Sequence, residues 1–121
     1  MAKILIVDDS RTSRKILRVI LQDAGFEICG EASNGEEGVA LYKELRPDVV
    51  TLDITMPVLD GVGALKQIVE FDKDAKAIMV TAAGQKNNVV EAIRCGAFEF
   101  VTKPFDEAII LDVINKAVSN E

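Results

Sequence analysis

Residues 3–7 read KILIV, a short apolar run that ends at two carboxylates, Asp8 and Asp9. A second run, residues 48–52 (DVVTL), ends in the same way at Asp53. Two like charges about 4 Å apart repel by about 4 kcal/mol at an effective dielectric of roughly 20, and crowded carboxylates respond with a raised pKa or a bound cation. If both runs are strands of one sheet, the three acids share one edge, and we expect their crowding to serve a function.

The rest of the chain repeats this beginning. Strand-like apolar runs recur at 27–32, 77–81 and 99–102, and the segments between the runs carry apolar residues at helical spacing. The pattern predicts five strand–helix units, each helix with one buried face. The residues expected on those faces are Ile16, Val19 and Ile20; Leu41, Tyr42 and Leu45; Leu65, Ile68 and Val69; Val89, Ala92 and Ile93; and Ile110, Val113, Ile114 and Ala117.

Turn and capping residues fall between these elements. Gly25 stands where a C′ glycine would end the first helix, and Pro47 forbids continuation of the second. Ser33 or Asn34 can cap the second helix, with Glu36 or Glu37 three residues further on. The residues that end the fourth helix and start the fifth are Gly96 and Asp106.

Strands that are apolar on both faces and separated by helices form a parallel sheet with helices on both sides. We therefore expect an α/β, (βα)5 doubly wound fold, as one domain over residues 1–121 with no linker or attached effector domain. If its strand order is the flavodoxin-like 2-1-3-4-5, the first, third, fourth and fifth strands are neighbours. Ligands of such sheets bind beyond the carboxyl ends of the strands. In this order Thr81, at the end of the fourth strand, and Lys103, after the fifth, converge with the three aspartates.

Composition excludes several classes of function. A net charge of −6 and a pI near 4.7 argue against a nucleic-acid ligand. No apolar run approaches the ~20 residues that span a bilayer, so we expect a soluble, cytoplasmic protein without a membrane partner. The chain has no histidine, which removes Ser-His and Cys-His catalysis and imidazole zinc sites. Cys29 and Cys95 lack C-x-x-C spacing, and we assign them no role.

Carboxylates without histidine or cysteine form an all-oxygen site that suits Mg²⁺ or Mn²⁺. Lys103 adds a point charge and Thr81 a hydroxyl, so the set predicts a place where a phosphoryl group is received beside a metal. A carboxylate can be the nucleophile of such a transfer, and Asp53 is our candidate because it is central in the sheet. Taken singly, an Asp after a strand often only caps a helix, and the Thr and Lys would be ordinary strand and surface residues; the combination carries the prediction.

Four segments closely resemble the receiver domain of bacterial two-component response regulators: residues 6–10 (IVDDS), 52–61 (LDITMPVLDG), 80–83 (VTAA) and 103–105 (KPF). The resemblance covers essentially the whole chain, in the family's order and spacing. A receiver with no output domain is similar to the stand-alone, CheY-like regulators. The DITMP run with the later residues 83–85 (AGQ) resembles the chemotaxis members in particular.

The resemblance implies a metal and an acceptor. Asp53 would take a phosphoryl group from a phosphohistidine on a partner histidine kinase. Asp9 and Asp53, with the backbone carbonyl of Thr55, would hold Mg²⁺, and Asp8 would act through a coordinated water. The protein would be a monomeric signalling protein whose only chemistry is its own phosphorylation and dephosphorylation, not an enzyme acting on external substrates.

The resemblance also implies a switch. Lys103 would pair with a phosphoryl oxygen, and its bond to Pro104 is often cis in this family. Thr81 would swing its hydroxyl toward the phosphate, and Phe100 would turn inward behind it. The readout surface would be the fourth helix, fifth strand and fifth helix, with a downstream protein such as a flagellar switch component, and a phosphatase, as further partners. An ordinary core aromatic is the alternative for Phe100.

Three positions depart from relatives within the family. Thr55 stands where several members carry Asn, Ala83 where several carry Glu or another polar residue, and Phe100 where some chemotaxis members carry Tyr, so phosphoryl lifetime and partner contacts do not transfer directly. The alternatives are a receiver of another phosphorelay, a non-switching receiver scaffold, a Mg²⁺-dependent aspartate-nucleophile phosphatase and a flavodoxin-like cofactor carrier. The last would need a phosphate-cradling loop where the chain has Asp8 and Asp9.

Overall fold

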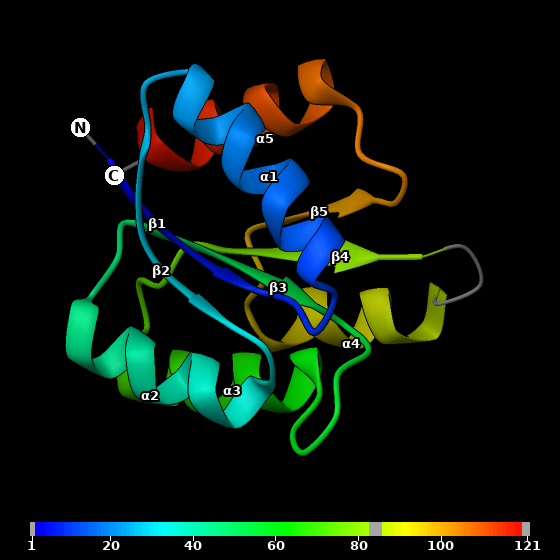
Figure 1. Ribbon diagram of the computed structural model, residues 1–121. Helices are drawn as coiled ribbons and strands as arrows, with labels where there is room; N and C mark the ends of the chain where they lie inside the picture. The colour runs from blue at the N-terminus through cyan, green and yellow to red at the C-terminus, as the bar shows by residue number, and fades with distance from the viewer. Residues whose placement is uncertain (1, 83–85, 120–121) are drawn as a thin grey trace.

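The computed structural model describes residues 2–82 and 86–119 (Figure 1). Within these ranges the chain alternates five times between strand and helix, as predicted. The third strand lies one residue later than expected, so that Asp53 is its last residue. The elements are β1 (Lys3–Val7), α1 (Arg11–Asp23), β2 (Glu27–Ala32), α2 (Gly35–Leu45), β3 (Val49–Asp53), α3 (Gly61–Phe71), β4 (Ala77–Thr81), α4 (Lys86–Cys95), β5 (Glu99–Thr102) and α5 (Glu107–Ser119).

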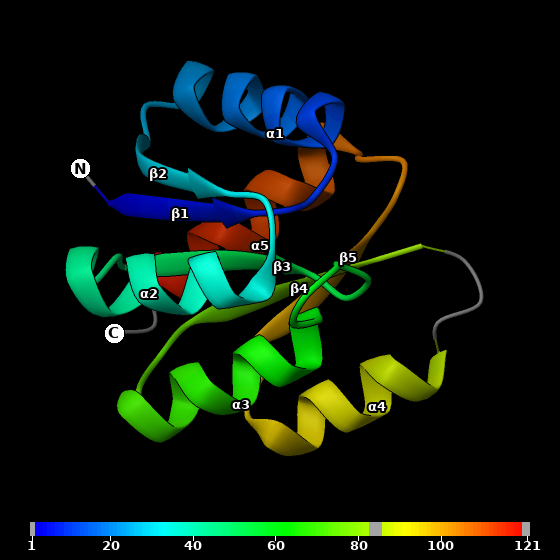
Figure 2. The ribbon, with the colours of Figure 1, turned by 60° about the horizontal axis from the view of Figure 1, so that its bottom comes forward.

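The strands form one parallel sheet in the order β2-β1-β3-β4-β5, which confirms the predicted flavodoxin-like topology. Helices α1 and α5 cover one face of this sheet, and α2, α3 and α4 cover the other (Figures 1 and 2). In the register, Val7 of β1 pairs with Leu52 of β3, and Asp53 pairs with Val80 of β4. The carboxyl ends of β1, β3 and β4 therefore meet at one edge.

The hydrophobic core consists of one cluster on each face of the sheet. Alternate residues of the central strands supply both clusters: Leu5 and Leu52 pack under α2 to α4, whereas Ile4 and Ile6 pack under α1 and α5. All five residues of β3 are buried. A strand buried on both faces holds its last residue, Asp53, in a fixed place.

The helix ends follow the predicted chemistry. Gly25, which follows the C-cap of α1, and Gly96, which follows α4, adopt positive φ angles of 94° and 110°, where an L side chain would be strained. Of the two proposed caps for α2, Asn34 takes the position and accepts a hydrogen bond from the Glu37 N–H at 2.8 Å. Asp106 accepts a hydrogen bond from the Ile109 N–H at the start of α5.

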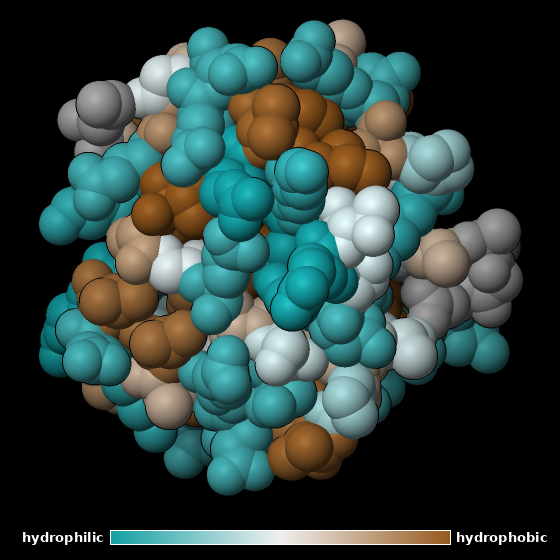
Figure 3. Space-filling model, in the orientation of Figure 1, coloured by the Kyte–Doolittle hydropathy of each residue, from teal (hydrophilic) through white to brown (hydrophobic). Residues whose placement is uncertain are grey.

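The predicted buried face of α1 is wrong at two of its three residues, because only Ile20 packs against the core. Ile16 and Val19 are each 45% exposed, and Leu17 and Leu21 are the residues that pack into the core. Apolar residues occupy most of positions 16–21, so spacing alone does not choose the face. Hydrophobic atoms accordingly lie among polar ones on the face that α1 presents (Figure 3). In α4, Ile93 is likewise exposed, against expectation.

Two further features bear on the class of protein. None of the helices in residues 2–82 and 86–119 has the length and apolarity needed to cross a membrane. Cys29 and Cys95 are half-buried free thiols. Burial raises the pKa of the Cys29 thiol, which donates to the carbonyl oxygen of Ile4 at 3.5 Å.

Candidate functional site

Three carboxylates meet at the carboxyl edge of the sheet. Asp8 and Asp9 directly follow β1, and Asp53 ends the adjacent strand β3. One oxygen from each lies within 4.8 Å of the others. Asp8 and Asp53 are only 3% and 6% exposed, whereas Asp9 is exposed. The structure therefore brings together the three acids that the sequence singled out.

The ammonium group of Lys103 lies between two of these acids. Its Nζ is 3.0 Å from Asp8 Oδ2 and 3.0 Å from Asp53 Oδ2. The residue sits just past β5, where its backbone N–H donates to the carbonyl oxygen of Thr81 at 2.9 Å. The peptide bond between Lys103 and Pro104 is cis. The ammonium group of Lys103, from the segment that follows the edge strand β5, thus bridges the ends of β1 and β3.

Burial and charge set the electrostatics of this cluster. Burial raises the pKa of Asp53; the hydrogen bond from Lys103 opposes that rise, and the neighbouring Asp8 charge adds to it. On acidification Asp53 takes up a proton at a higher pH than an isolated aspartate does. Burial alone would lower the pKa of Lys103, but its hydrogen bonds to Asp53 and Asp8 outweigh this and raise it. Lys103 therefore stays charged at neutral pH.

The two buried acids are also oriented by backbone groups. Asp8 Oδ1 accepts from the Ser10 N–H at 2.8 Å, and Asp53 Oδ1 accepts from the Thr55 N–H at 3.2 Å. Neither Asp8 nor Asp9 serves as the cap of α1, because Ser10 takes that position. Converging carboxylate oxygens without imidazole or thiolate fit a hard cation such as Mg²⁺ and do not fit zinc.

The β3–α3 loop is held by two glycines that sequence reasoning did not single out. The Gly61 N–H donates to the carbonyl oxygen of Ile54 at 2.9 Å, and a Cβ on Gly61 would lie 2.2 Å from the carbonyl oxygen of Asp53. The Gly35 N–H donates to the carbonyl oxygen of Leu59 at 2.9 Å, where a Cβ would lie 2.1 Å away. The loop after Asp53 therefore packs directly on α2 and α3, and side chains would not fit between them.

The two expected switch residues, Thr81 and Phe100, lie on the neighbouring strands β4 and β5. Thr81 is 4% exposed at the end of β4, and its hydroxyl donates to the carbonyl oxygen of Ala82 at 3.0 Å. Phe100 of β5 is 40% exposed. The alternative of an ordinary core aromatic is therefore wrong for Phe100, and the inward position expected of a switch residue is not the one it takes in this structure. The positions 83–85 lie outside the described residues.

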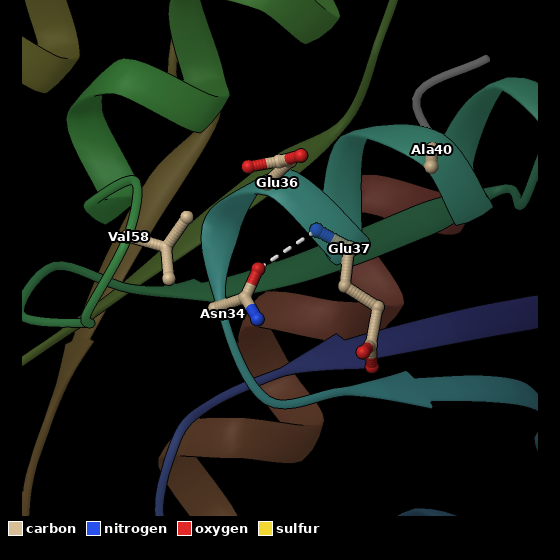
Figure 4. Close-up of a pocket in the computed structure, with 5 residues that line it drawn as sticks. All are labelled: Asn34, Glu36, Glu37, Ala40 and Val58. Carbon is tan, nitrogen blue, oxygen red and sulfur yellow. Dashed lines mark hydrogen bonds between the residues drawn. The ribbon is translucent and has the colours of Figure 1, made fainter.

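A hollow of about 370 Å³ borders the loop (Figure 4). Within it, Val58 is 76% exposed and has a φ of 69°, which is unusual for a β-branched residue. The Leu59 N–H donates to the carbonyl oxygen of Pro57 at 2.8 Å, so that Val58 is the middle residue of a strained γ-turn. Only knowledge of the backbone could have identified this position. The residues lining the hollow are Asn34, Glu36, Glu37, Ala40 and Val58.

Comparisons with known proteins agree with this geometry. A family model described as "Response regulator receiver domain" matches residues 4–115. The chemotaxis protein CheY of Thermotoga maritima is 47% identical over 114 residues, which cover 94% of this chain and 95% of that protein. The chemotaxis protein CheY of Listeria monocytogenes is 49% identical over 117 residues, covering 97% and 98%.

Solved structures give the same picture. A structure of the CheX–CheY–BeF3–Mg complex from Borrelia burgdorferi matches with a TM-score of 0.89 and 43% identity, over 93% of this chain and 86% of that one. A response regulator receiver domain protein from Clostridium thermocellum matches with a TM-score of 0.94 and 32% identity, over 99% and 96%.

Proposed function

The chain belongs to the response regulator receiver domain family, and from that premise we propose that Asp53 accepts a phosphoryl group from a phosphohistidine of a partner kinase. One observation carries the proposal: Asp53 is buried at the end of the central strand, grouped with Asp8 and Asp9 and bonded to Lys103. In the transfer, an Asp53 carboxylate oxygen forms a bond to phosphorus and the phosphorus–nitrogen bond of the donor breaks. The bonding pair returns to the imidazole, and the product on this chain is an acyl phosphate.

The acids have a second role in the proposal. Asp9, Asp53 and the backbone carbonyl of Thr55 would hold Mg²⁺, and Asp8 would act through a bound water. Receiver domains bind Mg²⁺ at an acidic pocket of this kind, and Mn²⁺, which prefers the same oxygen ligands, would substitute. When bound, the ion supplies positive charge that offsets the incoming phosphoryl oxygens. The Thr55 N–H, which donates to Asp53 Oδ1, would hold the Asp53 carboxylate in position for its attack on phosphorus.

Lys103 and the switch residues respond to the new group. The bridge from Lys103 to Asp8 and Asp53 supports a role in which its ammonium group transfers to a phosphoryl oxygen, a charge-assisted contact of the same kind. A phosphoryl group adds up to about two negative charges, which bias the adjoining loops toward one arrangement. Thr81 would turn its hydroxyl toward the phosphate, and Phe100 would leave its exposed position for an inward one.

The output of the switch would be a protein-binding surface on α4, β5 and α5. The chemotaxis proteins CheY among the relatives support a role in chemotaxis. The downstream target that we propose is a flagellar switch component. A CheX-type protein is a further candidate partner, because a CheY 43% identical to this chain is seen in complex with CheX. A phosphatase would complete the cycle. We propose that residues 1–121 act as one monomeric receiver domain in the cytoplasm, without catalysis on external substrates.

The central proposal is tested by intact mass after incubation with acetyl phosphate. We expect one phosphoryl adduct on the wild-type protein, formed in the presence of Mg²⁺ and lost when the metal is chelated. Asp53→Asn should carry none, whereas Asp60→Asn, a matched change at the exposed cap of α3, should be labelled normally. An unlabelled wild type, or a labelled Asp53→Asn protein, would sink the proposal. Sustained turnover of unrelated phosphomonoesters would favour the phosphatase alternative.

The chemotaxis assignment needs its own experiment. Binding of the protein to a flagellar switch component can be measured with and without beryllofluoride and Mg²⁺. We expect tighter binding of the activated protein. Equal binding in both states would count against this output while leaving the phosphorylation proposal intact.

A further inference from the structure

An exposed aromatic ring flanked by cations lies at the opposite edge of the sheet from Asp53. Helices α2 and α3 run side by side toward the edge where the strands begin (Figure 2). Phe71, the last residue of α3, is 40% exposed there. Lys43 Nζ lies 5.6 Å and the Arg46 guanidinium carbon 5.1 Å from the centre of its ring. Both distances are within the range of cation–π contacts.

The ring is held in place from beneath. Tyr42 is buried and meets Phe71 edge to face, with ring centroids 6.4 Å apart. The Tyr42 hydroxyl donates to Asp72 Oδ2 at 2.8 Å, which links the C-terminal turn of α2 to the end of α3. Arg46 caps α2 with a φ of 46°, a left-handed conformation that disfavours residues other than glycine. The aromatic ring and Arg46 are thus positioned before any ligand arrives.

Acidic residues stand on both sides of Phe71, Glu70 in the hollow beside the ring and Asp72 at the Tyr42 hydroxyl, but neither is ion-paired with Lys43 or Arg46. The protein has 20 acidic residues against 14 basic ones. Nevertheless, among the residues that the structure describes, no carboxylate lies within ion-pair distance of Lys43 or Arg46. A hollow of about 500 Å³ adjoins the ring, lined by Lys43, Gln67, Glu70 and Phe71.

We propose that Lys43, Arg46, Gln67 and Phe71, here called the Phe71 surface, bind an acidic peptide segment of a partner protein. Carboxylates of the segment meet the two cations, an adjoining apolar side chain packs on the exposed ring, and the Gln67 amide is available to the peptide backbone. Charge complementarity selects an acidic occupant, and the exposed ring selects one that also carries an apolar residue. Because the surface lies at the amino edge of the sheet, its occupant leaves Asp53 accessible, and the two sites act independently.

Glu70 gives the proposal a distinctive consequence. Its exposed carboxylate lines the same hollow and would repel an acidic segment. Glu70→Gln should therefore strengthen binding, by about threefold for one exposed charge contact. If Lys43 and Arg46 only contact the Phe71 ring and bind no peptide, Glu70→Gln will produce no gain in peptide affinity.

The test is an NMR titration of the ¹⁵N-labelled protein with an acetylated, amidated peptide of sequence DDFDE, with NNFNQ as the neutral control. We expect saturable shift changes confined to the ends of α2 and α3. Lys43→Gln with Arg46→Gln should weaken binding by about tenfold, as expected for two exposed charge contacts. Arg11→Gln with Lys15→Gln, the same change in charge on α1, should leave the affinity within about twofold. Phe71→Leu, which keeps apolar bulk, should weaken binding with little risk to folding.

Several results would overturn the proposal. They are equal shifts with the neutral peptide, the same shifts with inorganic phosphate alone, an equal loss in the α1 double variant, or no gain with Glu70→Gln. The titration is repeated on Asp53→Asn, for which we expect unchanged affinity. The outcome therefore does not depend on whether Asp53 is phosphorylated.

Discussion

The two halves of the candidate site differ in how firmly the fold holds them. The accepting half consists of Asp8, Asp53 and the β3–α3 loop: its two acids are almost fully buried, bonded to backbone N–H groups and bridged by Lys103. The reporting half consists of Thr81 and Phe100. Its threonine is buried, but its aromatic ring is 40% exposed, at the edge strand of the sheet.

This difference assigns the halves different physical tasks. A group that must receive a phosphoryl group at a defined geometry gains from a rigid surrounding. A group that must change position when charge arrives gains from having few contacts to break. The following substitutions test whether the accepting half is rigid and the reporting half loosely held.

The largest effect is expected from Gly61→Ala. The added Cβ would lie 2.2 Å from the carbonyl oxygen of Asp53, and it could move away only if the backbone of β3 or of α3 shifted. We expect the free energy of unfolding to fall by about 3 kcal/mol, measured by urea denaturation. Gly25→Ala is the control, because open space surrounds that position and only the positive φ of 94° opposes the change, at about 1 kcal/mol. Similar losses for the two variants would mean that the loop is not tightly held.

Phe100→Ala should cost less. A side chain that is 40% exposed loses about 1 kcal/mol on truncation, whereas a buried phenylalanine loses about 3 to 5 kcal/mol. The comparison variant is Phe98→Ala, because Phe98 packs against the core cluster under α1 and α5. Urea denaturation should show the larger loss for Phe98→Ala. A loss at Phe100 as large as that at Phe98 would show that the reporting half is packed after all.

The two halves also differ in how well the sequence predicted them. The strands and their parallel arrangement follow from runs that are apolar on both faces, and once the flavodoxin-like strand order is assumed, the acids at the strand ends meet for topological reasons. The register that makes Asp53 the last residue of β3 and the 3.0 Å bridge to Lys103 depend on packing that no short pattern encodes. The closeness of Gly61 to the Asp53 backbone could not be foreseen either, because a glycine has no side chain to indicate what lies beside it.

Side-chain placement on the helices and the edge strand was the weakest part. Helix α1 has apolar residues at five of its positions between 16 and 21, so the buried face depends on how the helix docks, and Ile16 and Val19 were assigned wrongly. In the structure, Arg14 and Arg18 both pair with Glu31 of β2, on the side of α1 that faces the sheet edge. Phe100 lies in an edge strand, where hydrophobicity does not decide between core and surface.

The next effect is a gain, expected from Thr51→Val in β3, the strand that carries Asp53 of the accepting half. Thr51 is 2% exposed in β3, and in the described part of the chain its hydroxyl has no hydrogen-bond partner. Valine keeps the shape and removes the unsatisfied group, so the free energy of unfolding should rise by about 1 kcal/mol. Thr102→Val, on the exposed side of β5, should change it by less than about 0.5 kcal/mol. A loss of stability in Thr51→Val would show that a partner, such as a buried water, satisfies the hydroxyl.

The smallest effect should come from Val58→Asn, in the same half. Val58 has a φ of 69°, and asparagine tolerates the left-handed region far better than a β-branched residue does. Because Val58 is 76% exposed, little packing is lost, and we expect a gain of about 0.5 kcal/mol in urea denaturation. Val58→Ala separates the causes, since alanine removes the branch but keeps most of the positive-φ penalty, and should gain less. An equal gain in both variants would place the strain in the branched side chain and not in the γ-turn, and the loop beside Asp53 would then owe its shape to Gly35 and Gly61 alone.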